Sequence, residues 1–158
     1  MVNNSAALDD EYRALAPIVN AADKFFLSLK DSKYETAWEL LTASSHKAII
    51  SDVYDSSRKV NGEIEKEEIR KDFNSGGKMF TNYWNSFHRS FNFDMILENS
   101  EWEMGVVGKE EATIIIRHNN SEAPTLLRMR KEDDSWKVGL AETFWQRKSL
   151  NFLHFIFQ

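Results

Sequence analysis

The sequence predicts an α+β domain in which N-terminal helices pack on one antiparallel sheet that curves around them. Up to about Phe91, the apolar residues recur at the spacing of three and four that gathers them on one face of a helix. From Phe93 to Trp145 they form short extended runs, with turn residues every ~8–12 positions, as in a β-meander. Helices followed by strands favour an α+β arrangement, and such a sheet can leave an apolar pocket beneath the helices.

The first helix is expected to begin at Pro17, with or without a lead-in turn before it, because proline suits the first turn of a helix, where its missing N–H costs nothing. Residues 1–12 are polar and are expected to be frayed. Ser32 breaks this helix and is expected to cap a short second one, with Glu35 three residues on as its capping-box partner. The second helix should end near Thr42.

A third helix should follow, with Ser44 or Ser45 as its cap. Its inward stripe is formed by Ile49, Ile50, Val53 and Tyr54. The Asn-Gly pair at 61–62 predicts a turn. The mostly charged residues 63–72 are then either a partly exposed helix or a mobile flap, and a Ser-Gly-Gly break follows at 75–77.

The next helix is the most aromatic, and its large side chains fall at steps of three and four, so they share one continuous face. They are Phe80, Tyr83, Trp84, Phe87 and Phe91, with His88 as their neighbour. We expect a core built on several of them together with residues from the other helices and the sheet. The predicted core residues are Phe25, Phe26, Trp38, Phe80, Trp84, Phe87, Ile114 and Val138.

Extended segments are expected over the rest of the chain. Their ranges are 93–98, 102–107, 112–118, 125–131 and 136–144, the first two forming separate strands or one bulged strand. In the last segment the strand period of two places Glu142 in a row with apolar side chains. Residues 146–158 form an unusually apolar tail, which we expect to pack on the domain itself or on a partner.

Composition limits the classes of function. The 158 residues suit one domain, and a net charge of −5, from 20 Lys+Arg against 25 Asp+Glu, argues against nucleic-acid and anionic-membrane partners. The absence of cysteine excludes disulfides and thiolate chemistry. No run approaches the ~20 apolar residues of a transmembrane helix, and the first residues lack a signal-peptide pattern. We therefore expect a cytoplasmic protein, although a removed export signal would leave the same sequence.

Three local patterns point to one family. The first is Phe25-Phe26 and Leu29, a polar break, Tyr34, then Ala37 and Leu40-Leu41. The second is Val107-Gly108 followed by Glu111-Ala112-Thr113-Ile114. The third is Leu127, Met129, Lys131-Glu132-Asp133, then Trp136-Lys137-Val138. Together they resemble the nuclear transport factor 2-like superfamily, specifically its small bacterial members, over roughly residues 17–145.

The resemblance implies a cone, in which helices lie in the hollow of a strongly curved antiparallel sheet with a pocket at the open end. Members of that superfamily include ketosteroid isomerase, scytalone dehydratase, limonene epoxide hydrolase, polyketide cyclases and non-catalytic association domains, and they often dimerise through the outer face of the sheet. Because one fold hosts so many activities, the resemblance predicts a fold with a pocket but no particular reaction. We expect a homodimer also because residues 114–116 and 126–127 place apolar side chains on both sheet faces.

Several classes of chemistry lack their residues. The four histidines stand alone in the sequence, so we expect no metal, and no cofactor motif is visible. A cysteine nucleophile and a Gly-x-Ser-x-Gly elbow are absent as well. General acid–base catalysis stays open through Glu142. This residue is either a partly buried carboxylate facing the hollow or, as we favour, a rim residue that pairs with an arginine.

Arg117 and Arg128 could bind this carboxylate or that of a ligand, although a ladder of surface charges is the more ordinary reading. His88, Tyr83 and Tyr54 could donate hydrogen bonds into the pocket, whereas a histidine on an aromatic face is more often a core or rim residue. The tryptophans are likewise more often core than ligand platform. The candidate pocket residues are Trp38, Tyr54, Tyr83, Trp84, His88, Arg117 and Glu142.

Three functions fit these observations. The leading one is a non-catalytic domain that binds a small apolar or amphipathic ligand or a partner protein. The alternative is a cofactor-independent enzyme of isomerase, dehydratase or cyclase type that acts on a small hydrophobic substrate by general acid–base catalysis. The third is an interaction module whose cone is filled by its own aromatic side chains. Convergent ionisable groups in a pocket would favour the enzyme, an apolar pocket the binding domain, and a filled cone the module.

Overall fold

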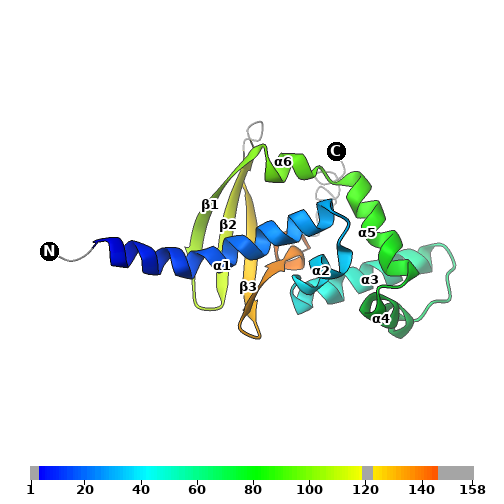
Figure 1. Ribbon diagram of the computed structural model, residues 1–158. Coiled ribbons are helices and arrows are strands. Elements are labelled where there is room, and N and C mark those ends of the chain that lie inside the picture. Colours follow the sequence, from blue (N-terminus) through cyan, green and yellow to red (C-terminus); the bar gives the residue numbers. More distant parts are fainter. Residues whose placement is uncertain (1–3, 119–122, 146–158) are drawn as a thin grey trace.

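Four antiparallel strands in the order β1-β2-β3-β4 form one sheet, with the long helix α1 lying across it (Figure 1). The computed structural model describes residues 4–118 and 123–145. The helices are α1 Asn4–Lys30, α2 Tyr34–Glu39, α3 Ala43–Lys59, α4 Lys66–Ser75, α5 Lys78–Ser90, α6 Phe93–Leu97 and α7 Leu140–Phe144. The strands are β1 Ser100–Val107, β2 Glu111–His118, β3 Thr125–Glu132 and β4 Ser135–Gly139. Long N-terminal helices with a curved antiparallel sheet form the α+β class that the sequence predicts.

Helix α1 begins at Asn4, and not at Pro17 as predicted, so residues 4–12 are helical. Pro17 lies inside the helix, where it removes one backbone hydrogen bond. The helix extends past it because the preceding segment is rich in alanine and leucine, which are strong helix formers. These first turns project beyond the sheet (Figure 1), and they carry Leu8 and Tyr12, which are 63% and 73% exposed.

The caps of α2 and α3 differ from the predicted ones. Ser32 has a left-handed φ of 59° and its N–H donates to the Leu29 carbonyl, so it ends α1 and does not cap α2. Helix α3 is capped by Thr42, whose Oγ1 accepts a hydrogen bond from the Ser45 N–H at 3.2 Å. Thr42 is fully buried, so its hydroxyl is held in place for further contacts.

The segments between α3 and α5 follow the predicted breaks. Asn61 has a φ of 59°, a value that asparagine tolerates in a turn. The charged stretch at 63–72 contains most of helix α4, which is anchored by the buried Ile69 and Phe73. Gly76 ends that helix with a φ of 64°, a conformation that glycine adopts without steric cost. Of the two readings of this stretch, the helix is therefore the observed one.

The strand predicted at 93–98 is wrong, because this segment forms the short helix α6. Asn92 caps the helix by accepting a hydrogen bond from the Met95 N–H at 3.1 Å. Asp94 adds an acidic group to the first turn, where the helix dipole favours negative charge. These two polar residues outweigh the preference of phenylalanine and isoleucine for strands.

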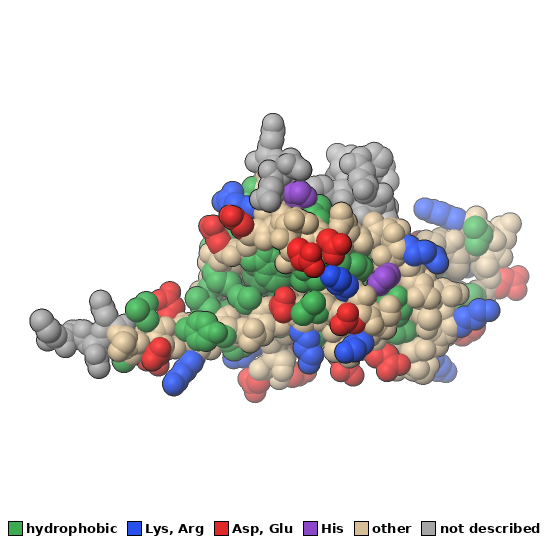
Figure 2. All heavy atoms as spheres, turned by 45° about the horizontal axis from the view of Figure 1, so that its top comes forward, with side chains coloured by type: hydrophobic (Ala, Val, Ile, Leu, Met, Phe, Trp, Pro, Cys, Tyr) green, Lys and Arg blue, Asp and Glu red, His purple; other side chains and the backbone are tan. Residues whose placement is uncertain are grey.

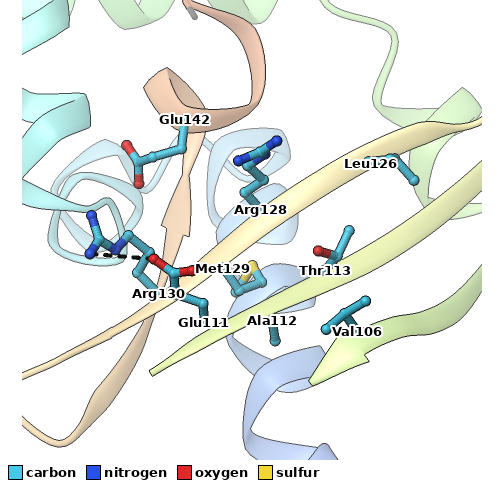
Figure 3. A pocket seen from close by; sticks show the side chains of 9 residues that line it. All are labelled: Val106, Glu111, Ala112, Thr113, Leu126, Arg128, Met129, Arg130 and Glu142. Carbon is cyan, nitrogen blue, oxygen red and sulfur yellow. Dashed lines mark ion pairs between the residues drawn. The ribbon is translucent and has the colours of Figure 1, made fainter. Parts of the chain in front are cut away.

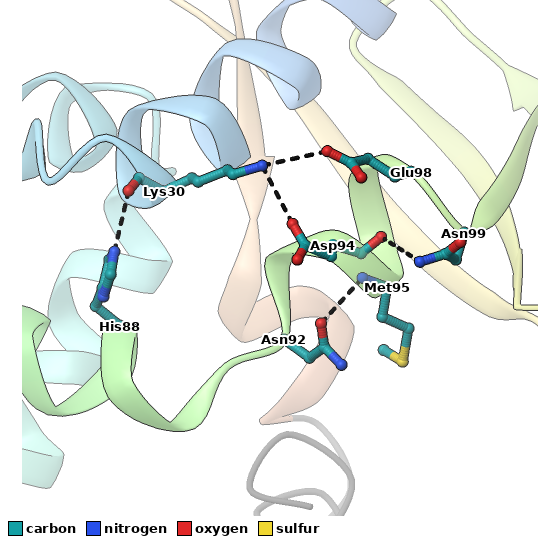
Figure 4. A network of polar contacts seen from close by, with 7 residues as sticks. All are labelled: Lys30, His88, Asn92, Asp94, Met95, Glu98 and Asn99. Carbon is teal, nitrogen blue, oxygen red and sulfur yellow. Dashed lines mark hydrogen bonds and ion pairs between the residues drawn. The ribbon is translucent and has the colours of Figure 1, made fainter.

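A polar network joins the end of α1 to α5 and α6 (Figure 4). Lys30 Nζ lies 3.1 Å from Asp94 Oδ1 and 3.3 Å from Glu98 Oε1, and the hydrogen bond to Asp94 is the main reason that the pKa of Lys30 is raised. His88 Nε2 donates to the Lys30 carbonyl at 3.0 Å. The ion pairs are solvent-exposed, so they position α6 more than they stabilise the fold.

The closing strand is shorter than predicted, because β4 ends at Gly139 and residues 140–144 form α7. The Thr143 hydroxyl accepts a hydrogen bond from the Arg128 N–H at 2.9 Å and donates one to the Gly139 carbonyl at 2.6 Å. It thereby satisfies a β3 amide at the point where β4 stops, which lets the chain turn into a helix. Glu142 thus lies on α7 and not on the strand face assigned to it from the sequence.

The sheet face toward the helices is closely filled. Its side chains are Ile114, Ile116, Leu127, Met129 and Val138, each at most 4% exposed. They form one cluster with apolar residues of α1, and all eight residues predicted for the core are buried. Contacts between the described side chains therefore account for the burial of this face.

The opposite face of the sheet, called the outer face below, is largely charged. Its exposed apolar side chains include Leu126, which is 51% exposed and pairs in register with the half-buried Ile115. On the face shown in Figure 2, charges of both signs are scattered and hydrophobic side chains appear over the projecting turns of α1. None of the described helices is long and apolar enough to cross a membrane. The apolar tail at 146–158 lies outside the described residues.

Candidate functional site

The residues predicted to line a pocket are dispersed over the molecule. Trp38, Tyr83 and Trp84 belong to an aromatic cluster between α2 and α5. The ring centroids of Trp38 and Trp84 are 6.3 Å apart and those of Tyr83 and Trp84 are 5.0 Å apart, both in edge-to-face contact. Trp84 is fully buried. Aromatic contacts of this kind stabilise packing, so these residues act in the core.

The two candidate tyrosines lie on α5 and α3. Burial, helped by the charge of Asp52, raises the pKa of Tyr83 far above its ordinary value, so its hydroxyl stays protonated at neutral pH. Tyr54 is half-buried, and its ring centroid lies 5.4 Å from the Arg58 guanidinium and 5.3 Å from Lys66 Nζ. The Tyr54 ring therefore already contacts cations of this chain.

Two histidines, His88 and His46, donate hydrogen bonds to backbone carbonyl groups. His88 is half-buried beside Phe93, with the hydrogen bond to α1 described above. His46, which sequence reasoning did not single out, stacks on Trp38 with centroids 3.9 Å apart, and its Nε2 donates to the Trp38 carbonyl at 2.7 Å. Burial lowers the pKa of His46, so this ring is neutral at pH 7. Both histidines serve the packing of helices.

Arg117 lies on the outer face of the sheet in a cross-strand pair. Its Nε is 4.0 Å from Glu103 Oε2 of β1, and both side chains are more than half exposed. Arg130 makes a similar pair with Glu111, at 3.6 Å, between register partners of β3 and β2. For these arginines the ladder of surface charges is the observed arrangement.

Glu142 departs from the interpretation that we favoured. It is 8% exposed and, among the described residues, pairs with no arginine, so it is a buried carboxylate and not a rim residue. Its Oε1 accepts a hydrogen bond from Thr42 Oγ1 at 3.0 Å. The reason for the difference is the early end of β4, which turns Glu142 toward the start of α3 instead of leaving it on a strand.

A directed chain of hydrogen bonds fixes this carboxylate. The Ala141 N–H donates to Ser45 Oγ at 3.0 Å, and Ser45 Oγ lies 2.7 Å from Thr42 Oγ1. Because the only hydroxyl proton of Thr42 is donated to Glu142, Ser45 must be the donor to Thr42. Thr42 and Ser45 are both fully buried. Sequence reasoning missed this role, and the only available signal was the run of hydroxyl residues before α3.

A groove on the outer face, called the outer groove below, opens beside Glu142 (Figure 3). Its volume is about 220 Å³. It is lined by Val106, Glu111, Ala112, Thr113, Leu126, Arg128, Met129, Arg130 and Glu142. The second carboxylate oxygen of Glu142, Oε2, is buried and has no hydrogen-bond partner in the described part of the chain. A buried acceptor without a partner is costly, so it marks a place where a donor from outside would bind.

Arg128 supplies the opposite charge in the outer groove. Within residues 4–118 and 123–145 its guanidinium makes no ion pair, in contrast to Arg117 and Arg130 on the same face. Arg128 and Glu142 thus line one groove without joining each other (Figure 3). Leu126 adds an exposed apolar surface. The arrangement offers an acceptor, a cation and an apolar wall, which together suit a small amphipathic molecule.

A second hollow lies near the start of α2, with a volume of about 460 Å³. It is lined by Ser32, Lys33, Tyr34, Glu35, Thr36, Gly76, Phe80 and Thr81. Its buried polar group is the hydroxyl of Tyr34, which already donates to Asn85 Oδ1 at 2.8 Å. This hollow therefore lacks the unsatisfied buried group that distinguishes the outer groove.

Gly139 holds the outer groove in shape, and Gly139→Ala should disrupt it. A Cβ at this position would lie 2.5 Å from Glu142 Oε2 and 2.8 Å from the Arg128 carbonyl oxygen. We expect a loss of about 1–3 kcal/mol in unfolding free energy, because overpacking of a buried site costs this much. Urea denaturation measures it, with Gly108→Ala in an exposed turn as the control. Equal losses in the two variants would contradict the close approach at Gly139.

Comparison of this chain with protein-family models, with curated proteins and with solved structures finds no match. Within the described ranges, no three His, Asp or Glu side chains come together in a way that could hold a metal ion.

Proposed function

We propose that this protein is a small-molecule binding domain whose ligand occupies the outer groove. The observation that carries the proposal is the pair of opposite charges that line one groove and are not paired with each other, Glu142 and Arg128. The sequence placed the ligand in an apolar pocket under the helices. The helix-facing side of the sheet is filled by the protein's own side chains, as expected for an interaction module, so the proposed ligand site lies instead in the charged groove of the outer face.

The energetic argument rests on Glu142. A buried carboxylate oxygen without a partner costs about 1–3 kcal/mol, and more for a charged group, so the fold retains it at the expense of stability. The carboxylate is nevertheless held in place by a series of hydrogen bonds that runs from the Ala141 N–H through the Ser45 hydroxyl to the Thr42 hydroxyl. A group that is costly and still rigidly positioned is characteristic of a functional site. A ligand that donates a hydrogen bond to Oε2 would remove the cost.

Binding is favoured over catalysis because only one group in this pair can transfer a proton. An arginine guanidinium is a permanent cation, and the other carboxylate that lines the groove, Glu111, is paired with Arg130, which leaves Glu142 as the candidate acid or base. Two groups with separated proton affinities are the usual requirement for acid–base chemistry on a neutral substrate. Glu142 and Arg128 are ionisable groups that converge on one groove. Because one is a hydrogen-bond acceptor and the other a permanent cation, they suit the binding of a ligand more than its chemical conversion.

An NMR fragment screen on the ¹⁵N-labelled protein tests this function. Ligands should shift the amide signals of Thr113, Leu126, Arg128 and Gly139, which line or adjoin the outer groove. Arg128→Gln should weaken the hits, whereas Arg117→Gln, which changes another exposed arginine outside the groove, should leave them unchanged. A screen whose hits all map to the aromatic core would overturn the proposed location.

The second candidate function is a cofactor-independent enzyme with Glu142 as general base. The observation in its favour is the same unpartnered oxygen, since a general base needs one oxygen that no protein donor occupies. NMR spectra of each bound fragment, recorded again after overnight incubation, separate the two functions. New ligand signals with the native protein and none with Glu142→Gln would establish catalysis. Unchanged ligand spectra support a binding domain.

We further propose a cytoplasmic homodimer with the cone of the nuclear transport factor 2-like superfamily. The curved sheet and the long helices support the family likeness. Exposed apolar side chains support the dimer, especially Leu8 and Tyr12 on the projecting turns of α1, whereas the charged outer face supports it less than the sequence suggested. Light scattering tests the dimer by measuring the molar mass in solution, because a dimer has twice the 18.4 kDa of one chain.

A further inference from the structure

We propose that the ligand of the outer groove is a zwitterionic amino carboxylate with a short aliphatic chain, such as a free aliphatic amino acid. The inference rests on the proposed function, because it names the ligand class for the same site. It follows from three features of the groove. Among the described residues, Glu142 and Arg128 each lack a partner of opposite charge, they start from adjoining positions in the fold, and an apolar wall lies beyond Arg128.

The ligand group at Glu142 should be a cationic donor. The carboxylate is 8% exposed, receives one hydrogen bond on Oε1 and makes no ion pair with another described residue. A buried carboxylate without a counter-ion is strongly unfavourable, and a neutral donor would satisfy the hydrogen bond but not the charge. An ammonium group satisfies both.

The ligand group at Arg128 should be a carboxylate. A guanidinium presents a planar fork that matches the two oxygens of a carboxylate, and Arg128 makes no ion pair within the described ranges. Its neighbour Arg130 is already paired with Glu111. The groove therefore carries one free site for an anion and one for a cation.

The two charged side chains start from adjoining positions in the fold. Gly139 pairs in register with Arg128, and Glu142 Oε2 and the Arg128 carbonyl both lie within 3.0 Å of the position where a Cβ of residue 139 would stand. The carboxylate of Glu142 thus adjoins the strand position from which the Arg128 side chain projects (Figure 3). A ligand that bridges them needs its two charges a few bonds apart, as in an α-amino acid.

The apolar chain of the ligand would run along β3. Leu126 is two residues from Arg128 on the same face of the strand, which is a step of about 6–7 Å. Figure 3 shows Leu126, Thr113 and Val106 on the side of Arg128 away from Glu142. Val106 is 79% exposed and Leu126 is 51% exposed, so both can be covered by a ligand. This order of cation, anion and apolar surface matches an aliphatic amino acid.

The test is a titration of the native protein with leucine and three analogues, followed by NMR. N-acetylleucine lacks the ammonium group, leucinamide lacks the carboxylate, and 4-methylpentanoate lacks the amine but keeps the chain. We expect leucine to bind in the outer groove and each analogue to bind at least about tenfold more weakly, since each loses a charge-assisted contact. Glu142→Gln should remove the preference for leucine over N-acetylleucine, and Arg128→Gln the preference over leucinamide.

The analogues on the native protein keep the test valid even where a variant at Glu142 fails to fold. Equal binding of leucine and 4-methylpentanoate in the groove would overturn the ligand class and leave the proposed function standing. Groove shifts from other fragments with none from leucine would do the same. If neither leucine nor any fragment shifts the amide signals of the groove, both the ligand class and the proposed function are wrong. The matched variant Arg117→Gln should bind all four compounds like the native protein.

Discussion

Replacing Trp84 with alanine is expected to lower the free energy of unfolding by about 3–5 kcal/mol, as for other large aromatics removed from a core. Trp84 is fully buried on α5, and its ring contacts those of Trp38, Phe80, Tyr83 and Phe87. Truncation would therefore leave a cavity in the centre of the aromatic cluster. Urea denaturation followed by far-ultraviolet circular dichroism measures the loss.

Two control variants sharpen this prediction. Val60→Ala shortens an apolar side chain that is 78% exposed, so it should change stability by no more than about 0.5 kcal/mol. Trp84→Phe keeps much of the ring and removes Nε1, a buried donor without a partner among the described groups, so it should cost clearly less than the alanine variant. A loss below about 1 kcal/mol for Trp84→Ala would place Trp84 at the surface.

Thr42→Ala is expected to cost about 2.5–4 kcal/mol, a large effect for the removal of one hydroxyl group. The hydroxyl caps α3 through the Ser45 N–H, and loss of such a cap costs about 1 kcal/mol. It also provides the hydrogen bond to Glu142 Oε1, without which both oxygens of a buried carboxylate would be unsatisfied. That loss adds about 1.5–3 kcal/mol, because the acceptor is charged.

Thr42→Ser is the matched control, because it keeps the hydroxyl and removes only a methyl group. It should retain more than half of the stability lost in Thr42→Ala. The double variant Thr42→Ala with Glu142→Ala should be less destabilised than the two single losses added together, since removing the carboxylate removes the need for its donor. Additive losses would mean that the two side chains are not coupled.

Local patterns predicted the elements that depend on a repeated period. The aromatic face of α5 and the strands β2 and β3 follow directly from steps of three, four and two. The two wrongly predicted strand segments lie where one polar residue decides between alternatives. Asn92 converts an apolar segment into helix α6, and the hydroxyl of Thr143 lets β4 end early. These side-chain hydrogen bonds are not predictable from the hydrophobic period of a segment, because that period reports only which residues share a face.

The candidate site was predictable only in part. Glu142 and Arg128 were recognisable as polar residues beside apolar ones, and both line the outer groove. The fixing of Glu142 by Thr42 and Ser45 was not predictable, because these hydroxyl groups lie nearly a hundred residues earlier and meet it only through the fold. The aromatic candidates shared one helix face, a pattern that a filled core and a ligand pocket produce equally.

A crystal structure of the protein with the tightest-binding compound of the leucine series is the sharpest test of the proposed binding mode. We expect a ligand in the outer groove with a donor nitrogen about 2.7–3.2 Å from Glu142 Oε2 and a carboxylate on Arg128. An ion pair between Arg128 and Glu142 that closes the groove, or a ligand seated between Trp38 and Trp84 in the core, would contradict it.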